Sequence, residues 1–436
     1  MKVCVIGTGY VGLVVGACLA DSGNEVICVD CDKEKLSNLE NGIIPIYEPL
    51  LEDLIKTNVK EKRLSFTSDT AYAVKNSLVC FIAVGTPSNP DGSCNLDYVK
   101  NAAKSIGQAI EKYTIIVNKS TIPVGGVDLV HSIIKEHTNV EFDVVSNPEF
   151  LKQGNAVEDF IKPDRVVIGT DSEKAYKIME ELYTPYLRTG NPILNMDVKS
   201  AELTKYASNC FLAMKISYIN QIANICEKIG ADVENIRQGM SFDKRIGNQF
   251  LFAGLGFGGS CFPKDVKALI NTASNYGCEF DLLKAIEDVN ARQKKIFVEK
   301  IKNRFNDLKG LTIAVWGLSF KPKTNDMREA PSIDIINTLL DLGAKIQAYD
   351  PKAADEAKKY FADKITYTSS CYEALNGANA LLLLTEWSEF QLVDFSKIKS
   401  LMKNPVIFDG RNQYNFKKLE EMGFEYYKIG KNCDIK

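Results

Sequence analysis

The chain has 436 residues, a length that one hydrophobic core rarely supports, so we expect two or three domains. It is 45% hydrophobic and 25% charged, as is typical of soluble globular proteins. The formal net charge of −3 provides no general attraction for nucleic acid or for an acidic membrane surface. We therefore expect no nucleic-acid partner and no membrane partner, and any anionic ligand must be held by a local cluster of basic residues.

The sequence begins on a strand-like run, residues 2–6, with no basic leader followed by an apolar segment and a cleavage site. No later segment reaches about 18 uninterrupted apolar residues, the length that a membrane-spanning helix needs. These features predict a cytoplasmic protein.

Twelve cysteines are scattered along apolar stretches, which does not indicate a disulfide framework. Cys28 and Cys31 have the spacing of a redox or zinc motif, but no second pair accompanies them, and Asp30 between them has a better explanation given below. His131 and His137 lie in a polar helical stretch and are expected at the surface. We therefore expect no metal site and no mechanism built on histidine.

The first part of the chain alternates short β-branched runs with helical patterns. The strand-like runs cover residues 3–6, 26–30, 78–84, 114–118, 142–146 and 165–168. Strands separated by helical crossovers predict a parallel, doubly wound sheet.

A long run of helix-forming residues without Gly or Pro follows, from about Lys199 to Ile229. Helical sequence continues to about residue 309, and strand-like runs then return at 311–316, 345–350, 380–384 and 406–408. We predict an α/β protein with two Rossmann-like, doubly wound parallel-sheet domains joined by a long central helix and a helical middle domain. The predicted domains cover residues 1–198, 199–309 and 310–436.

A glycine-rich turn, Gly7-Thr8-Gly9-Tyr10-Val11-Gly12, directly follows the first strand, and the second strand ends in Asp30. Glycines let the backbone approach a pyrophosphate, whose charge the N–H groups and dipole of the next helix stabilise. The acid can accept hydrogen bonds from a ribose diol and would repel a 2′-phosphate. This order predicts an NAD site, with NAD preferred over NADP; the alternative is a glycine-rich turn without a ligand. Residues 85–87 and 120–123 end strands of the same sheet and are expected to face the cofactor.

The stretch 254–265 reads G-L-G-F-G-G-S-C-F-P-K-D. Pro263 is tolerated in the first turn of a helix, which places Cys261 just before a helix N-terminus, where the dipole favours a thiolate. The glycines leave room for a ligand against the backbone, and Asp265 falls in the first turn of the helix. The segment alone would also fit a glycine-rich loop with a buried cysteine.

Other polar residues complement this cysteine. Lys205 and Asn209 are four residues apart on the long helix and so share a face, where a cation and an amide could contact a substrate oxygen. By itself that pair would usually be a solvated face. Glu149 adds a carboxylate after the fifth predicted strand. Together with a nicotinamide site they predict a covalent oxidation, in which a thiol traps an aldehyde, hydride loss gives a thioester, and water releases an acid.

Several longer motifs extend this pattern: G-T-G-Y-V-G, N-P-E-F-L, K-Y-A-S-N, R-I-G-N-Q-F-L-F-A-G-L-G-F-G-G-S-C-F-P-K-D, G-L-S-F-K-P-K-T-N-D-M-R-E-A-P-S and D-G-R-N. Through them the chain resembles the UDP-glucose/GDP-mannose dehydrogenase family almost from end to end. The resemblance implies oxidation of a sugar 6-hydroxyl to a carboxylate with two NAD⁺ and no release of the aldehyde. UDP-glucose, converted to UDP-glucuronate, is the expected substrate.

The resemblance also implies roles for individual residues. The catalytic residues would be Cys261 as nucleophile, Lys205 and Asn209 on the sugar oxygen, Asp265 orienting a water or accepting a proton, Glu149 in thioester hydrolysis, and Thr121 holding water and cofactor. The cofactor contacts would be Gly7, Gly9, Val11, Gly12, Asp30, Lys35, Thr86, Thr121, Gln153, Lys264 and Arg328. The substrate contacts would be Glu149, Phe150, Leu151, Lys205, Asn209, Arg245, Phe250, Leu251, Phe252, Ala253, Gly254, Phe257, Gly258, Lys321 and Arg411.

Lys321 and Arg411 would pair with the negatively charged diphosphate of the substrate, although the protein as a whole is acidic. Gln153 stands where many relatives carry a second glutamate, and since an amide cannot be a general base, that role falls to Glu149. The second α/β domain has Gly317-Leu318-Ser319-Phe320 in place of G-x-G-x-x-G, which is consistent with a nucleotide sugar there and not a second dinucleotide.

Two alternative functions stay open. Relatives acting on UDP-N-acetylmannosamine tend to have a histidine where this chain has Ser260, and those acting on GDP-mannose differ from its R-I-G-N-Q-F-L. A non-catalytic NAD-binding regulator is the other alternative, although it would not require an intact set of catalytic residues.

The long helix and Arg245, which resembles an arginine donated across a dimer interface, predict a homodimer or a higher homo-oligomer.

Overall fold

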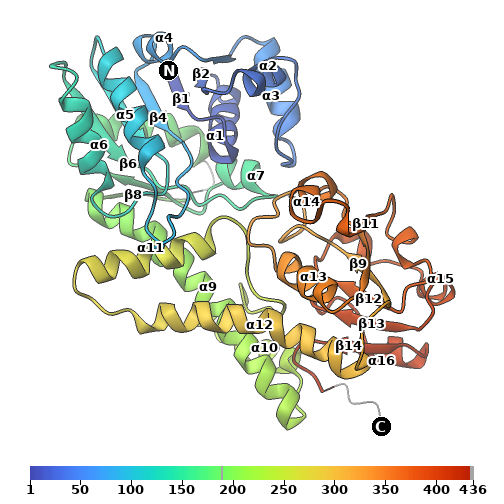
Figure 1. Ribbon diagram of the computed structural model, residues 1–436. Coiled ribbons are helices and arrows are strands. Elements are labelled where there is room, and N and C mark those ends of the chain that lie inside the picture. The colour runs from blue at the N-terminus through green and yellow to red at the C-terminus, as the bar shows by residue number, and fades with distance from the viewer. Residues whose placement is uncertain (188–189, 433–436) are drawn as a thin grey trace. The chain divides into compact units, whose positions relative to one another are not determined.

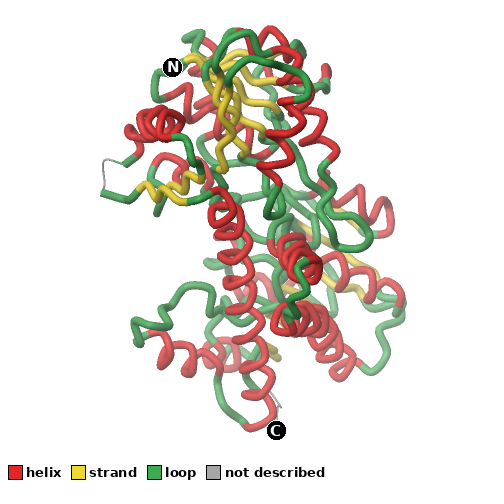
Figure 2. The backbone as a smooth tube through the Cα atoms, turned by 90° about the vertical axis from the view of Figure 1, so that its left-hand side faces the viewer, coloured by secondary structure: helices red, strands yellow, loops and turns green. Residues whose placement is uncertain are grey.

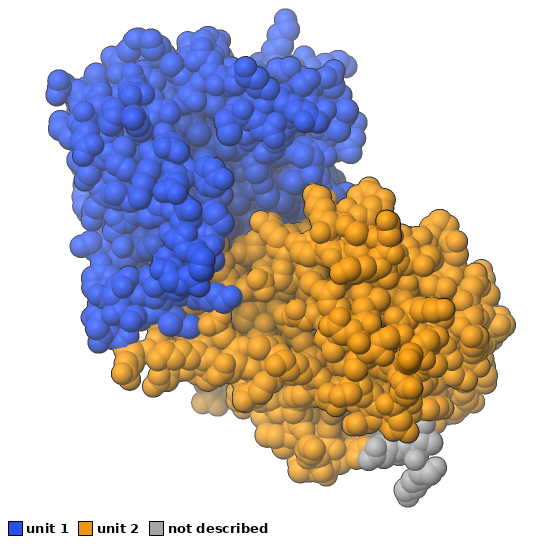
Figure 3. All heavy atoms as spheres, in the orientation of Figure 1, with its two compact units in different colours: residues 1–208, 267–278 blue, residues 209–266, 279–436 orange. Residues whose placement is uncertain are grey.

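The computed structural model describes residues 1–187 and 190–432. The chain divides into two compact units (Figure 3): unit 1 comprises Met1–Ser208 and Lys267–Cys278, and unit 2 comprises Asn209–Val266 and Glu279–Lys436. Helices α9 (Val198–Ile229) and α11 (Phe262–Asn275) contribute residues to both units. Each unit has its own sheet, mainly parallel in unit 1 and fully parallel in unit 2, which confirms the predicted fold class.

Unit 1 contains an 8-stranded sheet in the order β3-β2-β1-β4-β5-β6-β7-β8 (Figure 1). The strands are β1 (Lys2–Ile6), β2 (Glu25–Val29), β3 (Leu64–Thr67), β4 (Val79–Ile82), β5 (Thr114–Asn118), β6 (Phe142–Ser146), β7 (Val166–Gly169) and β8 (Ile193–Met196). The strands pair in parallel except β6 and β7, which meet antiparallel at Ser146 and Gly169. The sequence did not predict β3 and β8, because these short edge strands are only partly buried and lack a continuous apolar run.

Helices cover both faces of this sheet. They are α1 (Tyr10–Asp21), α2 (Lys33–Glu40), α3 (Leu51–Lys60), α4 (Thr70–Lys75), α5 (Asp97–Ala109), α6 (Gly126–Lys135), α7 (Ala156–Ile161) and α8 (Glu173–Tyr183), followed by the 3₁₀ turn η1 (Thr184–Tyr186). Successive strand residues point to opposite faces, so Val3 and Val5 join the core under α1, α3, α7 and α8, while Cys4 and Ile6 join the core under α4, α5 and α6. The carboxyl ends of the central parallel strands therefore meet along one edge.

Unit 2 contains a 6-stranded, fully parallel sheet in the order β11-β10-β9-β12-β13-β14. The strands are β9 (Thr312–Trp316), β10 (Lys345–Tyr349), β11 (Thr366–Tyr367), β12 (Ala380–Leu383), β13 (Val406–Asp409) and β14 (Glu425–Lys428). Its helices beyond α9 and α11 are α10 (Val233–Ser241), α12 (Asp281–Phe305), α13 (Pro331–Asp341), α14 (Ala354–Phe361), α15 (Phe395–Leu401) and α16 (Phe416–Glu421), with 3₁₀ turns η2 (Ala362–Lys364), η3 (Glu373–Leu375) and η4 (Ser388–Phe390).

The predicted central helix is α9, whose 32 residues run without a break (Figure 2). In unit 2 its residues Ile219 and Cys226 pack into one core with Phe297 of α12 and Phe408 of β13. The helices of the middle segment therefore share a core with the second sheet. The division into three domains stays a prediction.

Candidate active site

The first glycine-rich turn is shaped by close backbone contacts. Gly7 has a φ of 101°, and a Cβ there would lie 2.6 Å from the Ala83 carbonyl oxygen. A Cβ on Gly12 would lie 1.8 Å from the Gly7 oxygen, so neither position accepts a side chain. A Cβ on Gly9 would meet nothing within 4 Å, and no side chain caps the N-terminus of α1. The first-turn N–H groups of α1 thus lack a side-chain cap, which suits a bound pyrophosphate.

Asp30, at the end of β2, is held in its ionised form. Its Oδ2 accepts hydrogen bonds from the Thr8 N–H at 3.0 Å, the Thr8 hydroxyl at 2.5 Å and the Lys35 ammonium at 2.9 Å. Burial alone would raise the pKa of Asp30, but these bonds hold it well below its usual range. A carboxylate that is ionised at neutral pH can accept from a ribose diol, so Asp30 and Lys35 fit NAD.

The loops that follow the neighbouring strands β4 and β5 are joined to each other. The Thr86 hydroxyl of the first loop donates to the Thr121 carbonyl oxygen of the second at 3.0 Å. Glu202 of α9 accepts from the N–H groups of Gly125 and Val127 at 2.7 and 2.8 Å, which ties the second loop to the helix that carries Lys205. Both predicted threonines therefore lie in one loop cluster of unit 1.

Gln153 is next to a second junction of unit 1. The Gly154 N–H donates to Glu48 Oε2 at 2.6 Å, and the Tyr10 hydroxyl donates to the same carboxylate. Tyr10 is the first residue of α1, so Glu48 ties the Gln153 segment to the glycine-rich turn.

Glu149 and Lys205 form a buried ion pair. The Lys205 Nζ lies 2.9 Å from Glu149 Oε1, and the side chains are 5% and 6% exposed. The Leu151 N–H donates to the other carboxylate oxygen at 2.6 Å, and Lys205 also lies 5.5 Å from the Phe150 ring centroid. Burial opposes ionisation of Glu149, but Lys205, the Leu151 N–H and Lys119 together hold the pKa of the carboxyl below its ordinary value. Two charged groups are thus held out of water as an ion pair.

Asn209 and Asp265 form a second buried pair, in unit 2. The Asn209 amide donates to Asp265 Oδ2 at 2.6 Å, and Lys264 Nζ lies 2.7 Å from Oδ1 of the same carboxylate. The Asp265 N–H donates to the Cys261 carbonyl oxygen at 2.8 Å. Cys261 therefore occupies the position just before α11, and Pro263 lies in the first turn, as predicted. Lys264 is mostly buried and paired, so it is not a solvated side chain.

Three side-chain amides hold the glycine-rich loop of unit 2. Asn220 Oδ1 accepts from the Gly254 N–H at 2.8 Å, and Gln293 Nε2 donates to the Gly254 carbonyl at 2.9 Å. Asn290 bonds both backbone groups of Phe257, at 2.8 and 3.0 Å. No sequence pattern predicted these amides, because α9 and α12 bring them from 33 to 39 residues away along the chain.

We expect Gly258→Ala to destabilise the protein. A Cβ there would lie 2.2 Å from the Glu329 carbonyl oxygen, and backbone cannot yield as a side chain can. Overpacking of this kind costs about 1–3 kcal/mol, so the thermal unfolding midpoint should fall. Gly239→Ala is the matched control, because its Cβ would meet nothing within 4 Å inside α10, where alanine is favoured by about 1 kcal/mol. Equal midpoints for the two variants would contradict the expected clash.

Basic residues of unit 2 lie beside the same loop. Arg411 Nε donates to the Leu384 carbonyl at 2.7 Å and Nη2 to the Phe320 carbonyl at 3.2 Å. A Cβ on Gly254 would lie 3.7 Å from Arg411 Nη1, so loop and guanidinium are neighbours. Lys321 follows Phe320, with Nζ 5.5 Å from the Phe320 ring centroid. The structure thus brings Arg411 to the glycine-rich loop and Lys321 to the Phe320 ring, which a Cβ on Gly259 of that loop would meet at 2.8 Å.

Aromatic residues of the substrate set also gather here. The ring centroid of Phe262 lies 6.1 Å from that of Phe250 and 5.9 Å from that of Phe257. Phe250 has a φ of 62°, a strained conformation of the kind that clusters at functional sites. Leu251 and Ala253 are buried, and Leu251 joins the core of unit 2.

Three predicted residues have largely exposed side chains, although one of them, Arg328, still interacts electrostatically with Cys261. Arg245 is 89% exposed and pairs with Asp243, and Phe252 is largely exposed. The Arg328 side chain is 58% exposed and pairs with Asp326, although its carbonyl oxygen accepts from the Gly259 N–H at 2.9 Å.

Within the described part of the chain, no three His, Cys, Asp or Glu side chains are grouped to hold a metal ion. Residues 1–187 and 190–432 include no helix both long and apolar enough to cross a membrane.

Comparison with protein families decides what this arrangement belongs to. Three domains of one family match the chain: the NAD binding domain over residues 1–187, the central domain over 199–292 and the UDP binding domain over 314–416. The chain belongs to the UDP-glucose/GDP-mannose dehydrogenase family. The family's NAD binding domain covers Gly7 and Asp30, its central domain covers Lys205 and Cys261, and its UDP binding domain covers Lys321.

Individual members of the UDP-glucose/GDP-mannose dehydrogenase family are similar over their full length. The UDP-glucose 6-dehydrogenase TuaD of Bacillus subtilis is 48% identical over 432 residues, 99% of this chain and 93% of that protein. The UDP-glucose 6-dehydrogenase of Pseudomonas aeruginosa is 45% identical over 99% of this chain and 98% of that protein. The solved structure of a UDP-glucose dehydrogenase from the hyperthermophilic archaeon Pyrobaculum islandicum superposes with a TM-score of 0.91 at 36% identity, covering 99% of this chain and 97% of that one. The resemblance inferred from the motifs is confirmed.

Proposed function

We propose that this protein oxidises UDP-glucose to UDP-glucuronate and reduces two NAD⁺ for each sugar. The observation that carries the proposal is the position of Cys261, directly before α11 and beside the Asn209–Asp265 pair, at the end of a loop that buried amides hold in place. Full-length similarity to proteins named UDP-glucose 6-dehydrogenase supports UDP-glucose as the substrate.

Lys205 and Asn209 serve the first oxidation in this proposal. They lie one turn apart on α9, so a cation and an amide donor face the same side of one helix. Both can stabilise negative charge that develops on the sugar 6-oxygen as its proton leaves. When bound, NAD⁺ would supply the hydride acceptor for both oxidations. Thr86, Thr121, Asp30 and Lys35 are proposed to hold that cofactor.

Cys261 serves the second oxidation. Its sulfur forms a bond to the aldehyde carbon and the thiol proton passes to the aldehyde oxygen. Loss of a hydride from that carbon and of the hydroxyl proton to solvent then leaves a thioester. Water then adds to the thioester carbon, and the C–S bond breaks to release the carboxylate and the Cys261 thiol, which takes the second proton of the water. Glu149, ionised by its pairing with Lys205, accepts the proton of that water, while Asp265 orients it. Lys321 and Arg411 are proposed to bind the diphosphate.

The experiment that tests the proposal follows NADH absorbance after NAD⁺ is mixed with UDP-glucose, UDP-N-acetylmannosamine or GDP-mannose. We expect two NADH per sugar with UDP-glucose and UDP-glucuronate as the product. A faster reaction with either other sugar would reassign the substrate within the family. NAD⁺ binding without NADH from any of the three would indicate a regulator.

We propose that the protein acts as a homodimer built on α9. Phe211, Tyr218 and Ile225 are spaced by seven residues and are 58%, 49% and 53% exposed, as in the apolar seam of packed helices. Sedimentation of the wild type should give a dimer, and Tyr218→Glu, which places a charge in the seam, should shift it toward monomer. An unchanged sedimentation coefficient would exclude this seam.

We also propose a cytoplasmic location, where thiols such as Cys261 are kept reduced.

A further inference from the structure

Lys119, which the proposed reaction does not use, is buried at the end of β5. Its Nζ donates to Asn147 Oδ1 at 2.9 Å and to the Tyr183 hydroxyl at 3.3 Å. The ammonium also lies 5.6 Å from the centroid of the Tyr183 ring. Because a buried cation is costly unless other groups stabilise it, its place in unit 1 calls for an explanation.

Asn147 transmits the position of Lys119 to Glu149. Its side chain is fully buried, and besides the bond from Lys119 it accepts from Tyr183 at 2.6 Å and donates to the Val167 carbonyl at 2.7 Å. Pro148 alone separates it from Glu149, and the proline ring restricts the backbone between them. A shift of the Asn147 side chain would therefore move the catalytic carboxylate.

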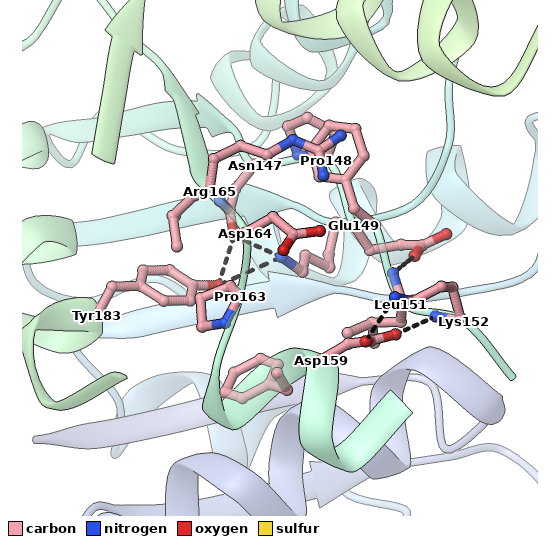
Figure 4. A pocket seen from close by; sticks show the side chains of 14 residues that line it. Asn147, Pro148, Glu149, Leu151, Lys152, Asp159, Pro163, Asp164, Arg165 and Tyr183 are labelled. Atoms are coloured by element: carbon pink, nitrogen blue, oxygen red, sulfur yellow. Dashed lines mark hydrogen bonds and ion pairs between the residues drawn. The ribbon is translucent and has the colours of Figure 1, made fainter. Parts of the chain in front are cut away.

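A cavity of about 40 Å³ lies among these groups (Figure 4). Lys119, Asn147, Glu149, Arg165 and Tyr183 line it, and this polar lining suits an ordered water. The guanidinium carbon of Arg165 lies 3.4 Å from the Phe150 ring centroid. The carboxylate proposed for hydrolysis thus shares a small polar cavity with a buried lysine.

The charge of Lys119 depends on its neighbours. Burial lowers the pKa of Lys119 to about 7, with the negative charge of Glu149 opposing that shift and the positive charge of Lys205 adding to it. The other charged groups that line the cavity are Lys152 and Asp159, which pair at 3.0 Å, and Asp164 and Arg165. The charge of Lys119 in turn helps to hold the pKa of Glu149 low.

We propose that Lys119 is a positioning residue for thioester hydrolysis: it holds the Asn147–Glu149 turn through Asn147 and Tyr183, and it places a titratable positive charge beside Glu149. This inference rests on the proposed function. Below about pH 7 the ammonium weakens Glu149 as a base. Above that pH Lys119 becomes neutral, the pKa of Glu149 rises while the carboxylate stays ionised, and proton transfer from water becomes faster.

The test measures the two halves of the reaction separately between about pH 5 and 9. A burst of two NADH per active site reports the oxidations, and the later steady rate reports hydrolysis, with the acyl-enzyme detected by intact mass. We expect the wild-type hydrolysis rate to rise about threefold to tenfold around pH 7, the scale of a pKa change of one unit or less in a general base. The burst rate should show a smaller change.

Two variants separate charge from shape. Lys119→Met lacks the charge at every pH, so the rise in hydrolysis rate near pH 7 should disappear. The fall in hydrolysis rate at low pH, the acid limb, reports protonation of Glu149, and it should move to higher pH in this variant. Lys119→Arg keeps the charge at every pH, so the rise should also disappear but the acid limb should stay low. The proposal would be overturned if both variants had the same pH profile of hydrolysis as the wild type. A wild-type hydrolysis rate that does not change around pH 7 would also overturn it, and this measurement needs no variant.

A second readout does not depend on activity. Because the pKa of Lys119 is lower in the folded state, unfolding takes up a proton between about pH 7 and 10, and this residue should make the protein more stable as pH rises through that window. Thermal unfolding of Lys119→Met should lack that gain, and a retained gain would show that Lys119 does not titrate there. If the wild type fails to oxidise UDP-glucose, the proposed function fails, whereas the unfolding result still reports on Lys119.

Discussion

Replacement of Cys261 by alanine is expected to abolish formation of UDP-glucuronate. The other thiol beside the Asn209–Asp265 pair, Cys210, is buried, and burial raises its pKa to about 12, so it should not replace Cys261. The acid product should therefore fall by roughly 10³-fold or more, the scale seen when the nucleophile of a covalent mechanism is removed. The first oxidation does not need the thiol, so a small amount of NADH, at most one per sugar, can still form. The measurement is chromatography of the sugar nucleotides together with NADH absorbance.

Cys278→Ser is the control for this experiment, because Cys278 is exposed and is not among the proposed site residues. It should retain wild-type turnover, which would exclude a general effect of cysteine replacement. A Cys261→Ala protein that makes UDP-glucuronate at the wild-type rate would contradict the covalent mechanism.

Lys205→Met is expected to reduce both turnover and stability. Loss of the cation that stabilises the sugar oxygen should lower kcat by about 10²- to 10⁴-fold. Removal of one partner of a buried ion pair also leaves the Glu149 carboxylate uncompensated, at a cost of about 3–5 kcal/mol. NADH kinetics and thermal unfolding report the two effects separately.

The stability effect should depend on pH in a defined direction. In the wild type the pKa of Glu149 is lowered, so its stabilising contribution is present above the ordinary carboxyl pKa and is lost as pH falls through the folded value. Without Lys205 burial dominates and raises that pKa, so the variant should lose stability as pH rises from about 5 to 8. The gap between the wild-type and variant unfolding midpoints should therefore widen over this range.

Two further proteins complete this test. Lys199→Met changes an exposed lysine of the same helix and should leave both readouts unchanged. The double variant Lys205→Met/Glu149→Gln removes both charges and should unfold at a higher temperature than Lys205→Met alone. If the single variant were as stable as the double variant at pH 8, the pair would not be a buried ion pair in solution.

Most of the fold could be predicted because buried parallel strands leave a strong local signal. Residues 114–118 (T-I-I-V-N) and 142–146 (F-D-V-V-S) are rich in apolar and β-branched residues, and both are strands with the predicted bounds. The four-residue edge strands β3 and β8 were missed, since only part of each is buried. The antiparallel pairing of β7 with β6 also has no local signature, because strand direction depends on the path of the connecting chain.

The sequence alone determined the chemical types of the site: a glycine-rich turn with an acid one strand later, a cysteine before a helix, and a lysine and an asparagine one turn apart. Each of these signals comes from residues within one element or on consecutive elements, where backbone geometry limits what the chain can do. Tertiary structure decided which groups meet: Glu149 with Lys205 across 56 residues, Asn209 with Asp265 across 56, and Lys119 with Tyr183 across 64. Partners so distant are chosen by the packing of helices on sheets, and the same packing removes water and so sets the charge of Lys119 and Glu149.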